Sequence, residues 1–302
     1  MSLLRLLADL LRPGAAPVED PLATELVRRA RDAHAAGRAA EARALFCQAL
    51  DARPNDLAAL HGLRDLVTAT GAWSEAVGLQ LRIVALAPPP NRAAEATTLA
   101  ALHYEIGRAE AGRGPAAAIG HYRSALKADR GFLPAVLGLG DALEATGDVR
   151  EAIRVWERAI ELEPALPLLA RLERAYRQDG RPSRMIALYR EAAERAPDNL
   201  AIAVALGRVY VELEMLDEAA DHLEKIEVRA PDVAAVHAYL GAVFERRGEL
   251  REAFAEYRRA LRLADAFEWP HACRVCGAAG FAWQDRCPSC RRWNTLRPSD
   301  GR

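Results

Sequence analysis

Four cysteines near the C-terminus are the residues of this sequence whose type and spacing most clearly imply chemistry. They form two CxxC pairs, Cys273 with Cys276 and Cys287 with Cys290, and ten residues separate the pairs. Each CxxC turn directs two sulfurs toward one ion, so two facing turns supply the four thiolates of a tetrahedral site. Because a four-sulfur shell leaves no open position for a substrate, we predict a structural metal site and not a hydrolytic one.

The segment that carries these cysteines, residues 266–302, is too short to form a self-sufficient hydrophobic core. We therefore expect metal binding, worth on the order of 10 kcal/mol, to supply its folding energy. The segment has six arginines against three acidic residues, and this positive charge offsets the net charge of −2 of a zinc ion with four thiolates. Zn²⁺ and iron both accept this ligand set, so the spacing does not decide between them.

The metal segment leaves more than one function open. With iron it would transfer electrons as rubredoxin does, and as a zinc ribbon it could bind nucleic acid. The whole chain has a net charge of −1 over 302 residues, which gives no general reason to expect nucleic acid as a partner. We assign the arginines and tryptophans near the cysteines to contacts with a protein partner, namely Trp283, Arg291, Arg292 and Trp293.

The rest of the chain offers no catalytic motif. We find no GxSxG, HExxH or phosphate-binding loop, and the histidines have no ligand spacing, so we predict that the protein is not an enzyme. The fifth cysteine, Cys47, is expected to be a small buried apolar residue. With neither a signal peptide nor an apolar run long enough to span a bilayer, we expect a cytoplasmic protein, in which paired cysteines bind metal and do not form disulfides.

The element that positions the cysteine segment is a repeat array over residues 22–265. The pattern V-x2-L-G-x2-L at 136–143 returns as A-x2-L-G-x2-Y at 203–210 and H-x2-L-G-x2-F at 237–244. The last two copies are 34 residues apart, which is typical of the tetratricopeptide repeat, a pair of antiparallel helices. We predict an all-α solenoid of about seven repeats, followed by a small zinc-ribbon or rubredoxin-like module.

Arrays of this kind present an inner groove to segments of partner proteins. In tetratricopeptide repeats the groove is usually lined by fixed positions of each first helix, and these positions hold Arg31, Arg174 and Arg208 here. The Lys and Asn pair with which related arrays bind a C-terminal carboxylate is absent. We therefore expect a mixed apolar and arginine groove for protein partners.

Residues 1–21 form a third segment, whose main feature is a leucine-rich stretch at 2–12. On a helical wheel its six leucines share one face, opposite two arginines and an aspartate. Such a helix, about 16 Å long, is too short to cross a bilayer. It could pack on the first repeat, or lie peripherally at the inner face of the plasma membrane.

One motif resembles a known family. The string CPSC-x2-W-x-TLRP from Cys287 to Pro298, placed after tetratricopeptide repeats and a first C-x2-C-G turn, resembles the lipopolysaccharide assembly protein B family. That resemblance implies a non-enzymatic bacterial adaptor that couples the membrane protease FtsH to the lipid A deacetylase and so limits lipopolysaccharide synthesis. It also implies the four cysteines as metal ligands. In place of the family's N-terminal membrane anchor we expect only the helix at residues 2–12, and we expect a shorter array, so a repeat scaffold with other clients remains the alternative.

Overall fold

The computed structural model describes residues 21–263, 270–280 and 282–299. The leucine-rich stretch at 2–12 lies outside these residues. The chain forms two compact units, residues 1–106 and 107–302, and helix α6 passes from the first into the second. In the described residues, no helix combines the length and the apolar character needed to cross a bilayer.

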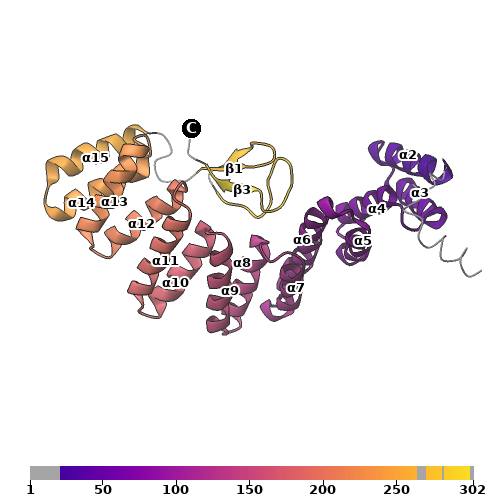
Figure 1. Cartoon of the computed structure of the whole chain (residues 1–302), viewed down its shortest axis with the longest axis horizontal. Helices are drawn as coiled ribbons and strands as arrows, with labels where there is room; N and C mark the ends of the chain where they lie inside the picture. The colour runs from indigo at the N-terminus through magenta and orange to yellow at the C-terminus, as the bar shows by residue number, and fades with distance from the viewer. Residues whose placement is uncertain (1–20, 264–269, 281, 300–302) are drawn as a thin grey trace, which may run out of the picture. The chain divides into compact units, whose positions relative to one another are not determined.

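Fourteen α-helices in the described residues follow one another along the chain as seven pairs, which confirms the prediction of an all-α tetratricopeptide array. Figure 1 shows the successive hairpins of the second unit from α8 to α15 lying side by side. The first helices are α2 (Pro21–Ala35), α4 (Leu57–Ala69), α6 (Arg92–Ala111), α8 (Leu133–Ala145), α10 (Leu166–Gln178), α12 (Leu200–Glu212) and α14 (Ala234–Arg247). The second helices are α3 (Ala39–Ala52), α5 (Trp73–Leu86), α7 (Pro115–Ala128), α9 (Val149–Leu162), α11 (Pro182–Arg195), α13 (Leu216–Arg229) and α15 (Leu250–Arg262). A short 3-10 helix, η1 (Pro89–Asn91), precedes α6.

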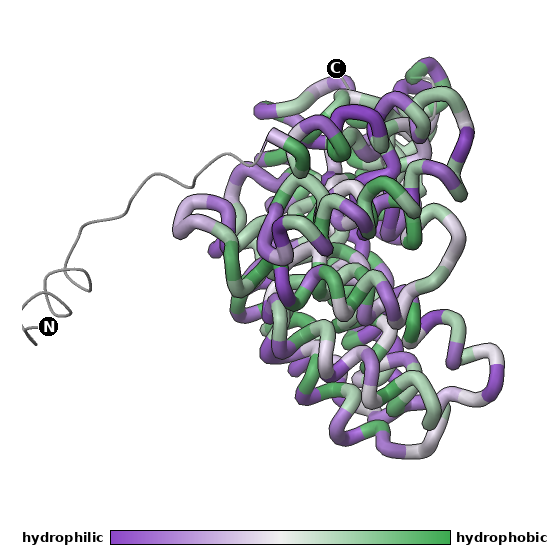
Figure 2. Tube along the Cα trace, turned by 90° about the vertical axis from the view of Figure 1, so that its right-hand side faces the viewer, coloured by the Kyte–Doolittle hydropathy of each residue, from purple (hydrophilic) through white to green (hydrophobic). Residues whose placement is uncertain are grey.

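Most of the helices bury an apolar face, and these faces meet between neighbouring helices. In Figure 2 hydrophobic and hydrophilic residues are mixed along the helices, as expected where one face packs and the other is exposed. The side chain of Trp156 on α9 is fully buried and is among the largest side chains in the core. A Cβ atom at Gly140 on α8 would lie 2.0 Å from its indole nitrogen. The glycine of the repeat motif therefore makes room for the large residue of the next helix.

We expect Gly140→Ala to lower the free energy of unfolding by about 1–3 kcal/mol, because the added methyl group collides with the Trp156 ring. Gly120, in the middle of α7, provides a matched control, since a Cβ atom there meets nothing within 4 Å. Gly120→Ala should instead stabilise the protein by about 0.5–1 kcal/mol through helix propensity. Urea unfolding of the two variants measures both effects. An equal loss in the free energy of unfolding of both variants would contradict the close approach of Trp156 to Gly140.

One residue differs from its prediction in the first unit. Cys47 lies on the exposed side of α3, so the expectation of a buried cysteine is wrong. Its neighbour Phe46 is 2% exposed and supplies the core contact of this part of the helix. The two residues are about 100° apart on the helix, and the buried stripe is narrow enough to include one and exclude the other.

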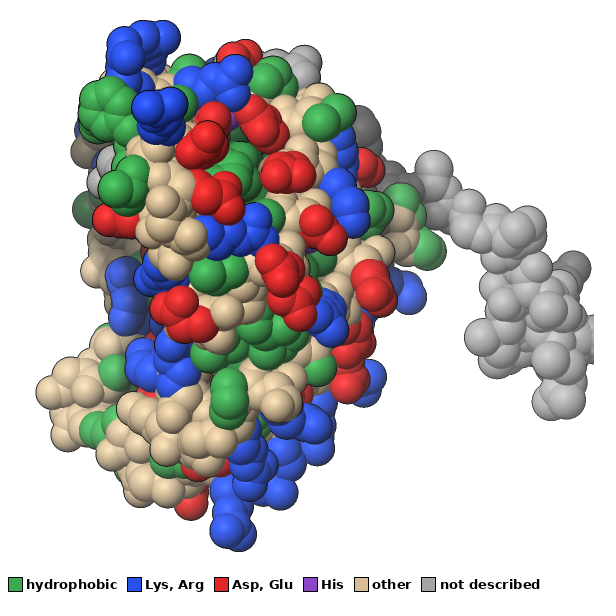
Figure 3. All heavy atoms as spheres, turned by 90° about the vertical axis from the view of Figure 1, so that its left-hand side faces the viewer, with side chains coloured by type: hydrophobic (Ala, Val, Ile, Leu, Met, Phe, Trp, Pro, Cys, Tyr) green, Lys and Arg blue, Asp and Glu red, His purple; other side chains and the backbone are tan. Residues whose placement is uncertain are grey.

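Ion pairs connect the first helices of adjacent repeats in the second unit. Arg171 on α10 donates two hydrogen bonds of 2.6 Å to Asp141 on α8. Arg208 on α12 donates to Glu173 on α10 at 2.5 Å, and Tyr189 on α11 donates to the same carboxylate at 2.6 Å. In the upper part of Figure 3, acidic and basic side chains likewise lie interspersed. Glu173 is thus a buried acidic group held by neighbours from two other helices.

The stability of the second unit should depend on pH through Glu173. Burial alone would raise the pKa of Glu173, but hydrogen bonds from Arg208, Tyr189 and Arg177 outweigh it and hold this pKa below the ordinary value of 4.5. A lowered folded-state pKa contributes stability that is present above about pH 4.5 and is lost as the pH falls through the folded value. The stability difference between the protein and its Glu173→Gln variant should therefore shrink on acidification below about pH 4.5. Chemical unfolding between about pH 7 and pH 3.5 measures this difference, and a constant difference would contradict it.

A small sheet follows the last repeat. Its strands are β1 (His271–Cys273), β2 (Ala279–Gly280) and β3 (Leu296–Pro298), in the order β2-β1-β3 with both pairings antiparallel. The core of this module contains two of the cysteines, Cys273 and Cys287, with Leu296. So little buried apolar surface agrees with the expectation that the module needs another source of folding energy.

Candidate metal centre

The structure brings the four predicted cysteines together. Their sulfur atoms all lie within 4.8 Å of one another, with 3.6 Å between Cys273 and Cys290 and 3.7 Å between Cys276 and Cys287. A tetrahedral ion with bonds of about 2.3 Å places its sulfur ligands about 3.8 Å apart. The four side chains therefore fit a tetrathiolate metal site. The geometry suits zinc and iron alike, so the identity of the metal stays open.

The two CxxC turns have the same backbone geometry. The N–H of Gly277 donates to the carbonyl of Cys273 at 2.9 Å, and the N–H of Arg291 donates to the carbonyl of Cys287 at 2.9 Å. Gly277 has a φ of 73°, and Arg291 has a φ of 57°. Arg291 thus occupies the left-handed conformation that glycine adopts in the first turn, at the steric cost that a side chain carries there.

Replacing Arg291 with glycine should relieve this strain. We expect Arg291→Gly to strengthen metal binding by about 1 kcal/mol, because the folded module no longer contains a side chain in a left-handed conformation. Arg291→Ala is the matched control, since it removes the same charge and keeps the strain. Competition with a chromophoric chelator measures the metal affinity of both variants. Equal affinities would show that the charge of Arg291, and not its backbone conformation, affects metal binding.

The pKa values of the Cys273 and Cys290 thiols are shifted in opposite directions. The Thr295 hydroxyl lies 3.2 Å from the sulfur of Cys273 and is the main cause that lowers the pKa of this thiol, to about 6. At Cys290 the backbone N–H of Arg292 lowers the pKa, but burial and the three neighbouring thiols outweigh it and raise the pKa to about 11. Metal binding uses all four sulfurs as thiolates, and a bound cation favours the deprotonated form of each thiol ligand.

The aromatic residues of the module have structural partners. Trp283 is partly buried and packs against the cysteine cluster. Trp293 is also partly buried, and the guanidinium group of Arg286 lies 4.3 Å from the centre of its ring. Arg291 and Arg292 are exposed. Of the four module residues assigned to partner contacts, the two arginines are thus the more accessible, and the proposal of partner binding is strongest for them.

The three groove arginines occupy different environments. Arg31 is exposed on α2, in the first unit. Arg174 forms an ion pair with Glu144, although about half of its side chain is exposed. Arg208 is mostly buried and pairs with Glu173 and with Glu212, the latter at 2.6 Å. Arg208 therefore has a role in joining adjacent repeats that its sequence position does not reveal.

The spacing of the cysteines gave no indication of two further residues near the metal site. Thr295 contributes the hydroxyl beside Cys273, and Arg297 on β3 reaches the repeats, where it pairs with Glu163 at 3.2 Å. The TLRP end of the sequence motif contains both residues, so the motif held the signal. Their contacts depend on how the module folds and docks, which the spacing of cysteines does not specify.

Comparisons with known protein families agree with this description. Residues 271–298 match the family described as rubredoxin metal binding domain. Residues 104–167, 137–199 and 176–243 match families described as tetratricopeptide repeat. Among solved structures, "MamA MSR-1 C2" is 25% identical and covers 54% of this chain and 95% of its own, with a TM-score of 0.38. A thermophilic tetratricopeptide repeat protein of Thermus thermophilus is 24% identical, and the match covers 62% of this chain and 98% of that protein, with a TM-score of 0.31.

The fold and the site together define a tetratricopeptide repeat protein with a C-terminal rubredoxin-type, metal-binding zinc ribbon. The combination is consistent with the lipopolysaccharide assembly protein B family, to which the CPSC motif pointed. Lipopolysaccharide assembly protein B of Escherichia coli strain K12 is 23% identical over 277 residues, which are 90% of this chain and 70% of that protein. The proteins of the same description from Escherichia coli O157:H7 and from O6:H1 strain CFT073 match to the same extent.

Proposed function

We propose that this chain is a non-enzymatic adaptor that limits lipopolysaccharide synthesis by bringing the lipid A deacetylase to the protease FtsH. The observation that carries the proposal is the order of its two parts: helical repeats first, then a closed four-cysteine module of the type matched at residues 271–298. The similarity to lipopolysaccharide assembly protein B over 90% of the chain supports the same function.

The repeat array and the metal module would each supply a separate contact surface. The repeat array offers an extended surface for a protein client, and its exposed arginines, Arg31 and Arg174, are accessible for contacts with acidic groups. The metal module offers two exposed arginines, Arg291 and Arg292. Because thiolates stay reduced in the cytoplasm, we place the protein there, with residues 2–12 as a peripheral contact to the inner face of the plasma membrane.

Affinity capture of the tagged full-length chain from its own cells tests the proposal. FtsH and the deacetylase should co-purify with the protein and with the Cys47→Ser variant, whose cysteine is exposed and lies in the other unit from the metal module. The Cys287→Ser variant should lose at least one of the two partners, because its module no longer binds metal. Absence of both partners from the capture with the unmodified chain would refute the proposal.

A further inference from the structure

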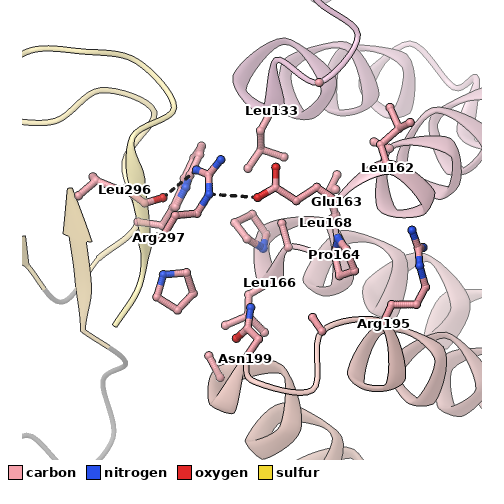
Figure 4. Close-up of a pocket in the computed structure, with 18 of the residues that line it drawn as sticks. Leu133, Leu162, Glu163, Pro164, Leu166, Leu168, Arg195, Asn199, Leu296 and Arg297 are labelled. Carbon is pink, nitrogen blue, oxygen red and sulfur yellow. Dashed lines mark hydrogen bonds and ion pairs between the residues drawn. The ribbon is translucent and has the colours of Figure 1, made fainter. Parts of the chain in front are cut away.

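A cavity of about 450 Å³ lies between the metal module and the repeats of the second unit. Three inter-helix turns, α7–α8, α9–α10 and α11–α12, form one wall, and β1, β3 and Trp283 form the other. Figure 4 shows Leu133, Leu166 and Asn199 on the repeat side and Arg297 reaching toward them from the module side, while Leu296 packs in the module core. A space of this volume between two structural parts is typical of a ligand site.

The repeat wall of the cavity contains apolar residues from the ends of three helices, beside its charged ones. The last residue of α9, Leu162, lines it with 62% of its surface exposed, and the first residues of α8 and α10, Leu133 and Leu166, line it as well. A single leucine with this much exposed surface is common in folded proteins. Here it coincides with other apolar lining residues and with the partly buried Trp283 from the opposite wall. The cavity thus offers an apolar surface to a large side chain.

The charge of the cavity is positive. Four arginines line it against two acidic residues, Glu163 and Asp198. Two of the arginines are engaged, since Arg297 pairs with Glu163 and Arg195 donates to the carbonyl of Ile160 at 3.0 Å. The other two arginines are Arg130 on the repeat wall and Arg274 on the module wall. Neither has a side-chain hydrogen bond or ion pair with the part of the chain that the structure describes, so both are available to an anionic group.

A partner strand that pairs with the free edge of β3 would find few backbone groups to bond to. The hydrogen bonds from the Arg274 N–H to the Thr295 carbonyl and from the Ser299 N–H to the Pro270 carbonyl, both 2.9 Å, fix which β3 residues bond to β1. Along an antiparallel strand, successive residues direct their backbone groups alternately toward the neighbouring strand and away from it. The backbone groups of Leu296 and Pro298 therefore point away from β1, to the free edge of β3. Pro298 has no N–H, and the Leu296 carbonyl already accepts from the Arg297 side chain at 3.1 Å. Recognition in the cavity therefore depends on side chains.

We propose that this cavity binds an extended segment of a partner protein in which a carboxylate side chain lies next to a large apolar side chain. The inference rests on the proposed function as a protein-binding adaptor. The apolar side chain occupies the space between Leu162, Leu166 and Trp283, and the carboxylate pairs with Arg130 and Arg274 from the two walls. Because one wall belongs to the metal module, the segment bridges module and repeats and fixes their relative position.

Fluorescence anisotropy with short labelled peptides tests the inference on the full-length protein. A peptide in which glutamate and leucine alternate should bind, whereas peptides with arginine in place of glutamate, or serine in place of leucine, should not. The double variant Arg130→Glu/Arg274→Glu should weaken binding of the first peptide about tenfold or more, and Leu162→Ser should weaken it as well. The control is Arg258→Glu, an exposed charge reversal on α15 outside the cavity, which should leave binding unchanged.

Three outcomes would overturn the inference: no binding of the glutamate–leucine peptide, equal binding of the arginine–leucine peptide, or unchanged affinity in the double variant. Helical circular dichroism and metal content of each variant show that it is folded. Failure of the proposed function gives a different result. If the peptide binds in the cavity while FtsH and the deacetylase are absent from the affinity capture, the cavity inference holds and the proposed function fails. If the double variant still captures both partners while no peptide binds, the proposed function holds and the cavity inference fails.

Discussion

Replacing Cys287 with serine is expected to abolish stoichiometric metal binding and to unfold residues 270–299, while the helical array remains folded. The reason is that the module buries little apolar surface besides its own sulfurs, and Cys287 itself is 1% exposed. Metal binding on the order of 10 kcal/mol is then its main source of folding energy. A serine hydroxyl is a poor ligand for a soft metal site, and it leaves a polar group buried among apolar neighbours.

Limited proteolysis followed by mass spectrometry measures this effect, together with metal analysis of the purified protein. The variant should lose its metal and be cleaved within the module, at sites that the unmodified protein protects. Cys47→Ser is the control, because that cysteine is exposed on α3 and should leave both metal content and protection unchanged. A Cys287→Ser protein with an unchanged cleavage pattern would show that the metal does not fold the module.

Arg208→Ala is expected to lower the free energy of unfolding by about 3 kcal/mol. The substitution removes the shortest ion pair of Glu173, at 2.5 Å, and leaves this carboxylate buried with Tyr189 and Arg177 as its remaining partners. The cost therefore comes mainly from the incompletely compensated charge. Arg31→Ala, at the equivalent position of the first repeat, should change stability by no more than about 0.5 kcal/mol because Arg31 is exposed.

Urea unfolding of both variants separates a structural from a binding role for these arginines. A small effect of similar size in both would contradict the buried ion pair at Arg208. The comparison also matters for the proposed groove, since a loss of partner binding in Arg208→Ala would report instability of the repeats as well as a lost contact. Arg31→Ala and Arg174→Ala are the variants suited to test the groove itself.

The sequence predicted those features that local patterns specify. The tetratricopeptide motif combines small and large residues at fixed spacing, so positions such as Gly140 and Trp156 indicated both the helices and their close crossing. The two CxxC turns likewise predicted the metal centre, because each turn depends on a few consecutive residues. Cys47 was predicted incorrectly, since a one-residue step around a helix decides between the core and the surface.

Contacts between distant residues were beyond reach of such patterns. Arg208 and Glu173 are 35 residues apart, and the ion pair between them depends on the stacking of α10 and α12. Arg297 and Glu163 are 134 residues apart, and their contact depends on where the module docks. The repeat period places Glu173 and Arg208 in adjacent first helices, but it does not specify that their side chains pair, and it says nothing of where the module docks. For the same reason the cavity between the module and the repeats emerged only with the structure.

The degradation rate of the lipid A deacetylase by purified FtsH is the measurement that tests the central claim most directly. It is taken with the full-length chain absent, present, and present as the Cys287→Ser variant. The account predicts faster degradation with the intact protein and little or no acceleration with the variant, because an adaptor needs its repeats and its metal-folded module together. An unchanged degradation rate on addition of the intact, metal-loaded protein would contradict it.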